Sequence, residues 1–146
     1  MDERGCKALE GLDERIIYSD KYGQYTKISI MVSGSNEYRD VFIDLDDINL
    51  LTTGNRWIIN KYGYVTRRYR CGGGRYELHY LHRDIMNTSD VVDHKDGNTL
   101  NCRKYNLRCC TQSQNAKNMR ISTTNTSGVK GVCWINLGRN GKQKYV

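Results

Sequence analysis

The fold is decided by a stretch that begins Val91-Val92-Asp93-His94-Lys95-Asp96-Gly97-Asn98 and ends Thr111-Gln112-Ser113-Gln114-Asn115-Ala116-Lys117-Asn118. Its first four residues predict a short strand, and Asp96-Gly97-Asn98 after them is typical of a tight turn. Asn106 to Cys110 predicts a second short strand. The stretch therefore places two short strands on either side of a turn-rich loop.

A helix is expected to follow the second strand. Thr111 and Gln114 fit a capping box, in which each side chain accepts a hydrogen bond from the other residue's backbone N–H. The helix is predicted from Gln112 to Arg120. Residues 91–120 therefore predict a ββα unit.

The residue types in this unit suit metal-assisted hydrolysis. Asp93 supplies a carboxylate oxygen, and Asn115, which lies 22 residues later, supplies an amide oxygen. Oxygen donors of this kind suit Mg²⁺, which keeps several of its waters. A neutral His94 beside them is a suitable general base near neutral pH. Since adjacent strand residues point to opposite faces, Asp93 and His94 share a site only if the strand ends or bulges there.

The unit closely resembles the HNH endonucleases, and more narrowly the homing nucleases of phages and introns. The order and spacing of several short motifs carry this resemblance, since a lone Asp-His pair would carry none. The matching motifs are Leu81-His82-Arg83, Val92-Asp93-His94, Asp96-Gly97-Asn98, Leu100-Asn101, Asn106-Leu107-Arg108 and Gln114-Asn115-Ala116-Lys117-Asn118.

The resemblance implies a role for each matching residue. His94 would deprotonate the attacking water, Asp93 and Asn115 would hold the metal, and Asn106 would order the loop and orient the histidine. It also implies Mg²⁺ or Mn²⁺ as cofactor, and a 5′-phosphate and a 3′-hydroxyl as products. Contacts with nucleic acid are expected from Arg83, Arg103, Arg108, Lys117, Asn118, Lys130 and Trp134, with loop bracing as the alternative role of Asn118.

The C-terminal stretch carries a second resemblance. Residues 127–134, Ser-Gly-Val-Lys-Gly-Val-Cys-Trp, and Gly141-Lys142-Gln143-Lys144-Tyr145 look like the first hairpin of an APETALA2-type DNA-binding domain. The third strand and helix of such a domain would lie beyond Val146, so this part is expected to be a partial module. The alternative is a small β extension that packs on the HNH unit.

Further strands are predicted upstream of the ββα unit. They cover Tyr25 to Val32, Arg39 to Leu45, Trp57 to Ile59, Tyr62 to Tyr69 and Tyr76 to His82, with a short helix start at Asp44 to Ile48 and a turn at Gly72 to Gly74. The resemblance to homing nucleases extends over this region and covers residues 40–146, with Leu81-His82-Arg83 interpreted as strand. Tyrosines alternate with arginines between residues 62 and 82, which fits either a half-buried sheet or a phosphate-contacting face. The side chain of His82 is expected either to face the same cleft as His94 or to lie in the core or on the surface.

Charge is distributed unevenly along the chain. The net charge is +7, yet residues 1–50 contain 6 basic and 11 acidic residues, whereas residues 93–146 contain 10 basic and 2 acidic ones. A steep gradient of this kind indicates a polyanionic partner, and nucleic acid fits best.

Other functional classes are disfavoured by composition. The charged N-terminus lacks the apolar stretch of a signal peptide, and no apolar run reaches the length of a membrane helix. An intracellular protein is therefore expected, and the resemblance to homing nucleases implies that a phage or mobile element encodes it. The 6 cysteines have irregular spacings, so free thiols are expected rather than a zinc site.

Together these observations predict an α+β protein: a small antiparallel sheet, then a ββα-metal core, then a C-terminal β-hairpin. The expected regions are 1–50, acidic and β-rich; 51–122, the nuclease domain with its core at 91–120; and 123–146, the partial DNA-binding hairpin. The predicted function is metal-dependent cleavage of double-stranded DNA, and a monomer is favoured. The alternatives are a DNA-binding regulator with an inactive core, and a zinc-stapled structural or RNA-binding module.

Overall fold

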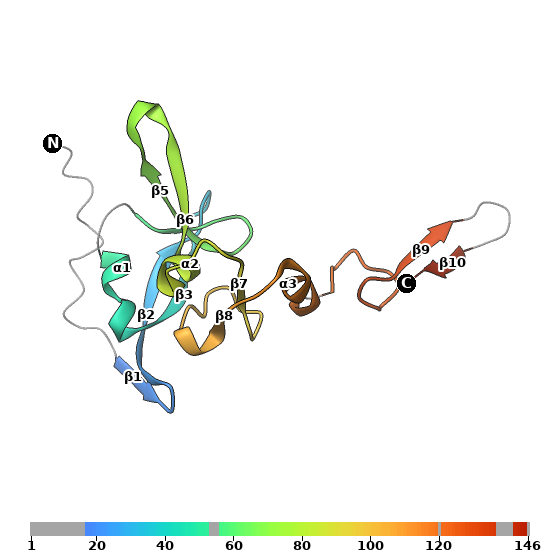
Figure 1. Ribbon diagram of the computed structural model, residues 1–146, viewed down its shortest axis with the longest axis horizontal. Helices are drawn as coiled ribbons and strands as arrows, with labels where there is room; N and C mark the ends of the chain where they lie inside the picture. Colours follow the sequence, from blue (N-terminus) through green and yellow to red (C-terminus); the bar gives the residue numbers. More distant parts are fainter. Residues whose placement is uncertain (1–16, 53–55, 120, 137–141, 146) are drawn as a thin grey trace.

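The computed structural model describes residues 17–52, 56–119, 121–136 and 142–145. Small antiparallel sheets and a few short helices make up this part of the chain, so the α+β prediction is confirmed (Figure 1). The charged sequence of residues 1–15 indicates weak helical character or disorder, and these residues lie outside the described ranges.

The first sheet is an antiparallel meander. β1 (Ile17–Asp20) pairs with β2 (Gly23–Met31), and β2 pairs with β3 (Tyr38–Asp44). Both strands are predicted by the sequence, β2 at Tyr25 to Val32 and β3 at Arg39 to Leu45. The 3-10 helix η3 (Leu45–Asp47) and α1 (Asn49–Thr52) follow β3 at the place where a helix start was predicted.

The second sheet is formed by β4 (Ile58–Ile59), β5 (Val65–Arg70) and β6 (Tyr76–Tyr80) in that order. The predicted glycine turn between β5 and β6 is the short helical turn η4 (Gly72–Gly74). The strand prediction for Leu81-His82-Arg83 is wrong, because these residues begin the helix α2 (Leu81–Met86).

α2 buries one of its sides. Leu81, His82 and Ile85 are all buried. Positions 81, 82 and 85 lie on one side of a helix. Asn87 ends α2 in the left-handed conformation, with φ of 47°.

The third unit has the predicted order of strand, loop, strand and helix. β7 (Val92–His94) pairs antiparallel with β8 (Leu107–Cys109), and the 3-10 turn η5 (Lys104–Asn106) immediately precedes β8. α3 (Gln112–Asn118) follows, and both hydrogen bonds of the predicted capping box are present between Thr111 and Gln114. A hairpin of β9 (Cys133–Asn136) and β10 (Lys142–Tyr145) lies beyond α3, apart from the other sheets (Figure 1).

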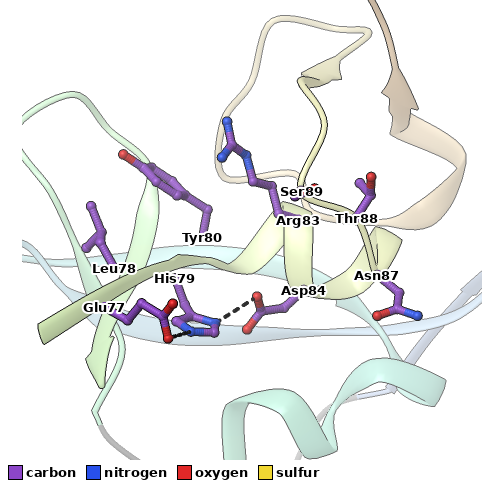
Figure 2. A pocket seen from close by; sticks show the side chains of 9 residues that line it. All are labelled: Glu77, Leu78, His79, Tyr80, Arg83, Asp84, Asn87, Thr88 and Ser89. Atoms are coloured by element: carbon purple, nitrogen blue, oxygen red, sulfur yellow. Dashed lines mark hydrogen bonds and ion pairs between the residues drawn. The ribbon is translucent and has the colours of Figure 1, made fainter. Parts of the chain in front are cut away.

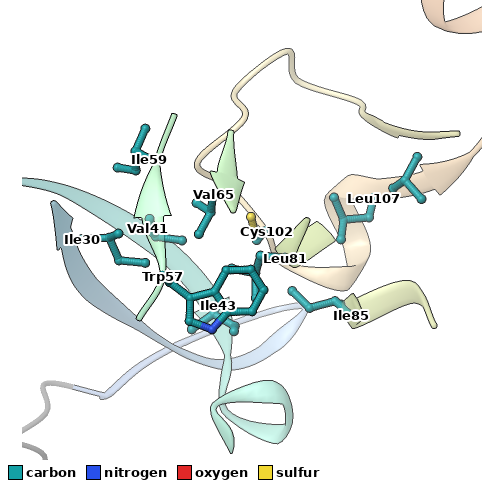
Figure 3. Packing of buried hydrophobic residues seen from close by; sticks show 11 residues of the cluster. Ile30, Val41, Ile43, Trp57, Ile59, Val65, Leu81, Ile85, Cys102 and Leu107 are labelled. Carbon is teal, nitrogen blue, oxygen red and sulfur yellow. The ribbon is translucent and has the colours of Figure 1, made fainter. Parts of the chain in front are cut away.

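One hydrophobic cluster joins these units across the predicted boundary at residue 50. Val41 and Ile43 of β3 pack with Leu81 of α2 and with Cys102 and Leu107 of the ββα unit (Figure 3). The loop before η5 also pairs with β3, because the Phe42 amide donates to the Leu100 carbonyl and the Cys102 amide donates to the Phe42 carbonyl. The first sheet thus supports the loop that connects β7 to β8.

Among the helices in the described part of the chain, none is both long and apolar enough to cross a membrane.

Candidate active site

Asp93 lies in the middle of β7, and its carboxylate is held from two directions. Arg108 is its cross-strand partner and donates to Oδ2 from Nε at 3.1 Å and from Nη2 at 2.7 Å. Asn118 of α3 donates to Oδ1 at 3.0 Å. Although Asp93 is only 6% exposed, its negative charge is therefore paired and hydrogen-bonded, as a buried carboxylate requires.

His94 is buried among rings and a thiol. The His82 ring lies edge-on to it with centroids 5.0 Å apart, the Tyr64 ring lies 6.2 Å away, and Nε2 is 4.0 Å from Cys102 Sγ. Burial lowers the pKa of His94 below its usual value, although the carboxylates of Asp96 and Asp93 act in the opposite direction. The imidazole is therefore neutral at neutral pH, which a general base requires.

The side chains of Asp93 and His94 meet different surroundings. The β7–β8 register is continuous, with Asp93 opposite Arg108 and His94 opposite Leu107, so no bulge brings the two together. The carboxylate faces Arg108 and α3, whereas the imidazole faces His82 and Tyr64. The two groups flank one short strand.

α3 is tied to β7 by a single amide. Asn118 Nδ2 donates to the Asp93 carboxylate at 3.0 Å and to the His94 carbonyl at 2.9 Å. Asn115, one turn earlier, is half-buried, and the structure gives its side chain no hydrogen bond with the described residues. Of the two helix amides, the one that touches both Asp93 and His94 is therefore Asn118.

Asn106 holds the loop between the two strands. Its side chain donates to Asp96 Oδ1 and to the Asn101 carbonyl, both at 2.9 Å, and accepts from the Asp96 amide at 3.1 Å. The Asp96 carboxylate in turn accepts from the Asn98 amide and from Asn101 Nδ2. These bonds lower the pKa of Asp96 against the opposing effect of its burial.

The expected DNA-contacting residues lie in different environments. Lys117 and Trp134 are exposed, and Lys130 donates to the carbonyls of Lys117 and Met119 at the end of α3. Arg83 is half-buried with its guanidinium over the Tyr80 ring, and Arg108 and Asn118 are engaged with Asp93.

Arg103 differs from the others. Its side chain is 3% exposed and is paired with Asp20 and Asp44, at 2.6 Å and 2.7 Å. These carboxylates raise the pKa of the guanidinium above its usual value. We therefore assign Arg103 to the support of the fold and do not carry it forward as a DNA contact, because no face of it is open to a phosphate.

The oxygen donors near Asp93 are of the type that a hard cation prefers. In the structure, however, the Asp93 carboxylate is bound by Arg108. In the described part of the chain, no group of three or more His, Cys, Asp or Glu side chains is arranged to hold a metal ion. A cation at Asp93 would therefore depend on one carboxylate, helix amides, water and phosphate oxygens, which is the ligand set that Mg²⁺ commonly accepts.

One comparison with known proteins falls on this site. A family model described as HNH endonuclease matches residues 89–117, which cover β7, β8 and nearly all of α3. Protein 3.8 of Escherichia phage T7 is 46% identical over 43 residues, which are 30% of this chain and 36% of that protein. The chain thus matches little more than a third of the length of this relative. No solved structure matches.

Two neighbours of His94 did not follow from the sequence. Tyr64 and Cys102 contact His94 because separate segments fold onto β7, and no local pattern signals that contact. The pairing of Arg108 with Asp93 could have been found, since it follows from the register of the two short strands. Asn118 carried a weak signal, because it lies three residues after Asn115 on the same helix.

Proposed function

We propose that this chain is a metal-dependent HNH endonuclease that hydrolyses phosphodiester bonds of double-stranded DNA, of the homing type and encoded by a phage or mobile element. One observation carries the proposal: next to the segment that matches the HNH model, Asn118 of α3 donates to the Asp93 carboxylate and to the His94 carbonyl, which ties the helix to the strand that holds both residues. The positive charge of the second half of the chain supports a polyanionic substrate.

In this proposal His94 is the general base. Its low pKa keeps an accepting nitrogen available at neutral pH, and the ring packing of His82 and Tyr64 fixes its orientation. Asn106 acts indirectly, by ordering the loop that follows β7.

Asp93 would hold Mg²⁺ or Mn²⁺ together with an amide oxygen from α3. Asn115 matches the family pattern, and Asn118 is the amide in contact with the carboxylate. The cation, when bound, would stabilise the negative charge that develops on the leaving oxygen. Arg108 must release Oδ2 or share it, because its guanidinium occupies that oxygen in the structure.

The placement of base and carboxylate on opposite faces of β7 supports the proposed chemistry. In a phosphoryl displacement the attacking and leaving oxygens lie roughly in line, on opposite sides of phosphorus. A base and a cation that serve these two oxygens must therefore stand apart. Asp93 and His94 meet this requirement if the scissile phosphate lies across the end of β7.

The remaining proposed DNA contacts lie outside this centre. Lys117, Lys130 and Trp134 belong to α3 and the segment after it, and Trp134 on β9 is 44% exposed. We assign the β9–β10 hairpin to DNA contact as the beginning of an APETALA2-type module, and we propose that the chain acts as a monomer.

A plasmid-nicking assay tests the proposed function. The purified chain should convert supercoiled plasmid to nicked or linear DNA with Mg²⁺ or Mn²⁺, and EDTA should abolish this conversion. DNA binding without cutting under any divalent cation would instead identify a regulator with an inactive core. Full cutting in excess chelator would contradict the metal mechanism.

A further inference from the structure

The β5–β6 hairpin has two faces of very different chemistry. Its register pairs Arg68 with Leu78 and Arg70 with Tyr76, so these four side chains lie on one face, which also contains Tyr80. We call this set the hairpin face: Arg68, Arg70, Tyr76, Leu78 and Tyr80. The opposite face contains Arg67, Tyr69, Glu77 and His79.

The opposite face is occupied by its own contacts. Arg67 donates to Asp84 at 3.0 Å and stacks on the rings of Trp57 and Tyr69. His79 lies between Asp84 and Glu77, at 3.3 Å and 3.8 Å. Figure 2 shows Glu77 and His79 on one side of β6, directed toward Asp84, and Leu78 and Tyr80 on the other. The only acidic residue of the hairpin thus lies away from the hairpin face.

The hairpin face combines arginines with exposed apolar groups. Arg68 and Arg70 are exposed, Tyr76 is 66% exposed and Leu78 is 49% exposed. Exposed arginines beside large exposed apolar side chains are typical of a surface that contacts both the phosphates and the bases of a nucleic acid.

Arg83 extends this surface from α2. Its guanidinium lies over the Tyr80 ring, and its Nε is buried with no hydrogen-bond partner in the described part of the chain. A buried donor without a partner costs free energy that a bound acceptor would recover. A phosphate oxygen is an acceptor that an arginine suits particularly well.

The hairpin face leads directly to the candidate active site. The Tyr80 ring is 5.5 Å from the His82 ring, which lies 5.0 Å from the His94 ring. A strand that crosses Tyr80 and Arg83 therefore approaches His94 from the side where His82 and Tyr64 pack.

The hairpin also has a suitable shape. β4 pairs only with Val65 and Thr66, so β5 and β6 project beyond the sheet as a two-stranded ribbon (Figure 1). The major groove of duplex DNA admits a ribbon of this kind. We propose that the hairpin face and Arg83 dock on duplex DNA and place the strand to be cut beside His94. This inference rests on the proposed action on duplex DNA and adds the surface that positions the substrate.

Binding of a short duplex in EDTA, measured over a range of salt concentrations, tests this proposal without any cutting. The double variant Arg68→Gln/Arg70→Gln should bind more weakly, and the slope of log affinity against log salt should become shallower by about 2, since each phosphate contact contributes about −0.9. The matched control is Arg39→Gln/Arg56→Gln, which removes the same charge from exposed arginines outside the hairpin and should leave the slope nearly unchanged. Circular dichroism checks that each variant is folded.

The outcomes separate this proposal from the proposed nuclease activity. If the hairpin variant binds like the control variant, or if the wild type prefers a single strand to the duplex or binds neither, the docking proposal is overturned. If the hairpin variant loses affinity and salt dependence but the wild type never cuts, the docking proposal stands and the nuclease proposal fails.

Discussion

At the scale of single residues, the site depends on how the free-energy cost of burying each polar side chain is offset. Asp93 is buried but receives hydrogen bonds from Arg108 and Asn118, so its charge is compensated. His94 and His82 are buried in contact with each other, and burial favours the neutral form of both. Cys102 beside them stays a thiol, because burial raises its pKa to about 12.

Replacement of the proposed base should separate chemistry from binding. His94→Ala should lower the cleavage rate by on the order of 10²–10⁴, the usual cost of losing general base catalysis. Duplex affinity should hardly change, because arginine and lysine contacts provide it. Cleavage rates and binding isotherms measured side by side check both parts. Cutting at the wild-type rate would exclude His94 as the base and make His82 the next candidate.

Protonation of His82 should make stability depend on pH. Burial, followed by the charges of His94 and Arg83, lowers the pKa of His82 from 6.5 to about 3 in the folded protein. The unfolded chain therefore holds a proton between these pH values that the folded chain does not. The contribution of His82 to the free energy of unfolding is therefore fully present above pH 6.5. As the pH falls below this value, the contribution decreases by up to about 1.4 kcal/mol per pH unit.

Urea unfolding between pH 4 and pH 7 measures this dependence, and His82→Gln is the comparison. The variant should lose less of its unfolding free energy than the wild type on acidification, although it starts from a lower value. Equal pH slopes for the two proteins would show that His82 does not carry the effect.

At the scale of elements, the sequence predicts those features that depend only on residues close together in the chain. The capping box of Thr111 and Gln114 needs only the first turn of α3, so it was visible in the sequence. The strand β2 likewise follows from alternation. The helix α2 was missed because the simultaneous burial of Leu81 and His82 depends on distant segments packing against them.

In the β7–β8 pair, Arg108 and a bound cation would compete for the same carboxylate oxygen of Asp93. Arg108 holds Asp93 Oδ2, and its side chain is 44% exposed, so this pair should be worth about 1 kcal/mol or less. Arg108→Gln should therefore bind Mn²⁺ more tightly without DNA, by up to roughly fivefold. Calorimetric titration measures this change, and Asp93→Asn is the control that should lose the site. Weaker Mn²⁺ binding by Arg108→Gln would contradict competition for the carboxylate.

At the scale of the whole molecule, the first sheet and the ββα unit act as one body. Arg103 connects them, because it precedes η5 and its partners Asp20 and Asp44 lie at the ends of β1 and β3. The rings of Tyr25 and Tyr105 flank its guanidinium, with centroids 4.0 Å and 4.8 Å away. Asp20 and Asp44 are 83 and 59 residues from Arg103 in sequence, so no local pattern indicates these ion pairs.

Removal of Arg103 should therefore destabilise the whole fold and not only DNA binding. Arg103→Ala leaves Asp20 and Asp44 without their cation and opens a gap between the two tyrosine rings, and loss of one partner of a buried ion pair costs about 3–5 kcal/mol. The neighbouring Lys104 is the matched control, because it also pairs with an acidic residue, Asp47, but its side chain is 51% exposed. Lys104→Ala should cost no more than about 1 kcal/mol. Urea unfolding of the three proteins measures both changes, and an Arg103→Ala variant as stable as Lys104→Ala, with weaker DNA binding, would return Arg103 to the DNA-contacting residues.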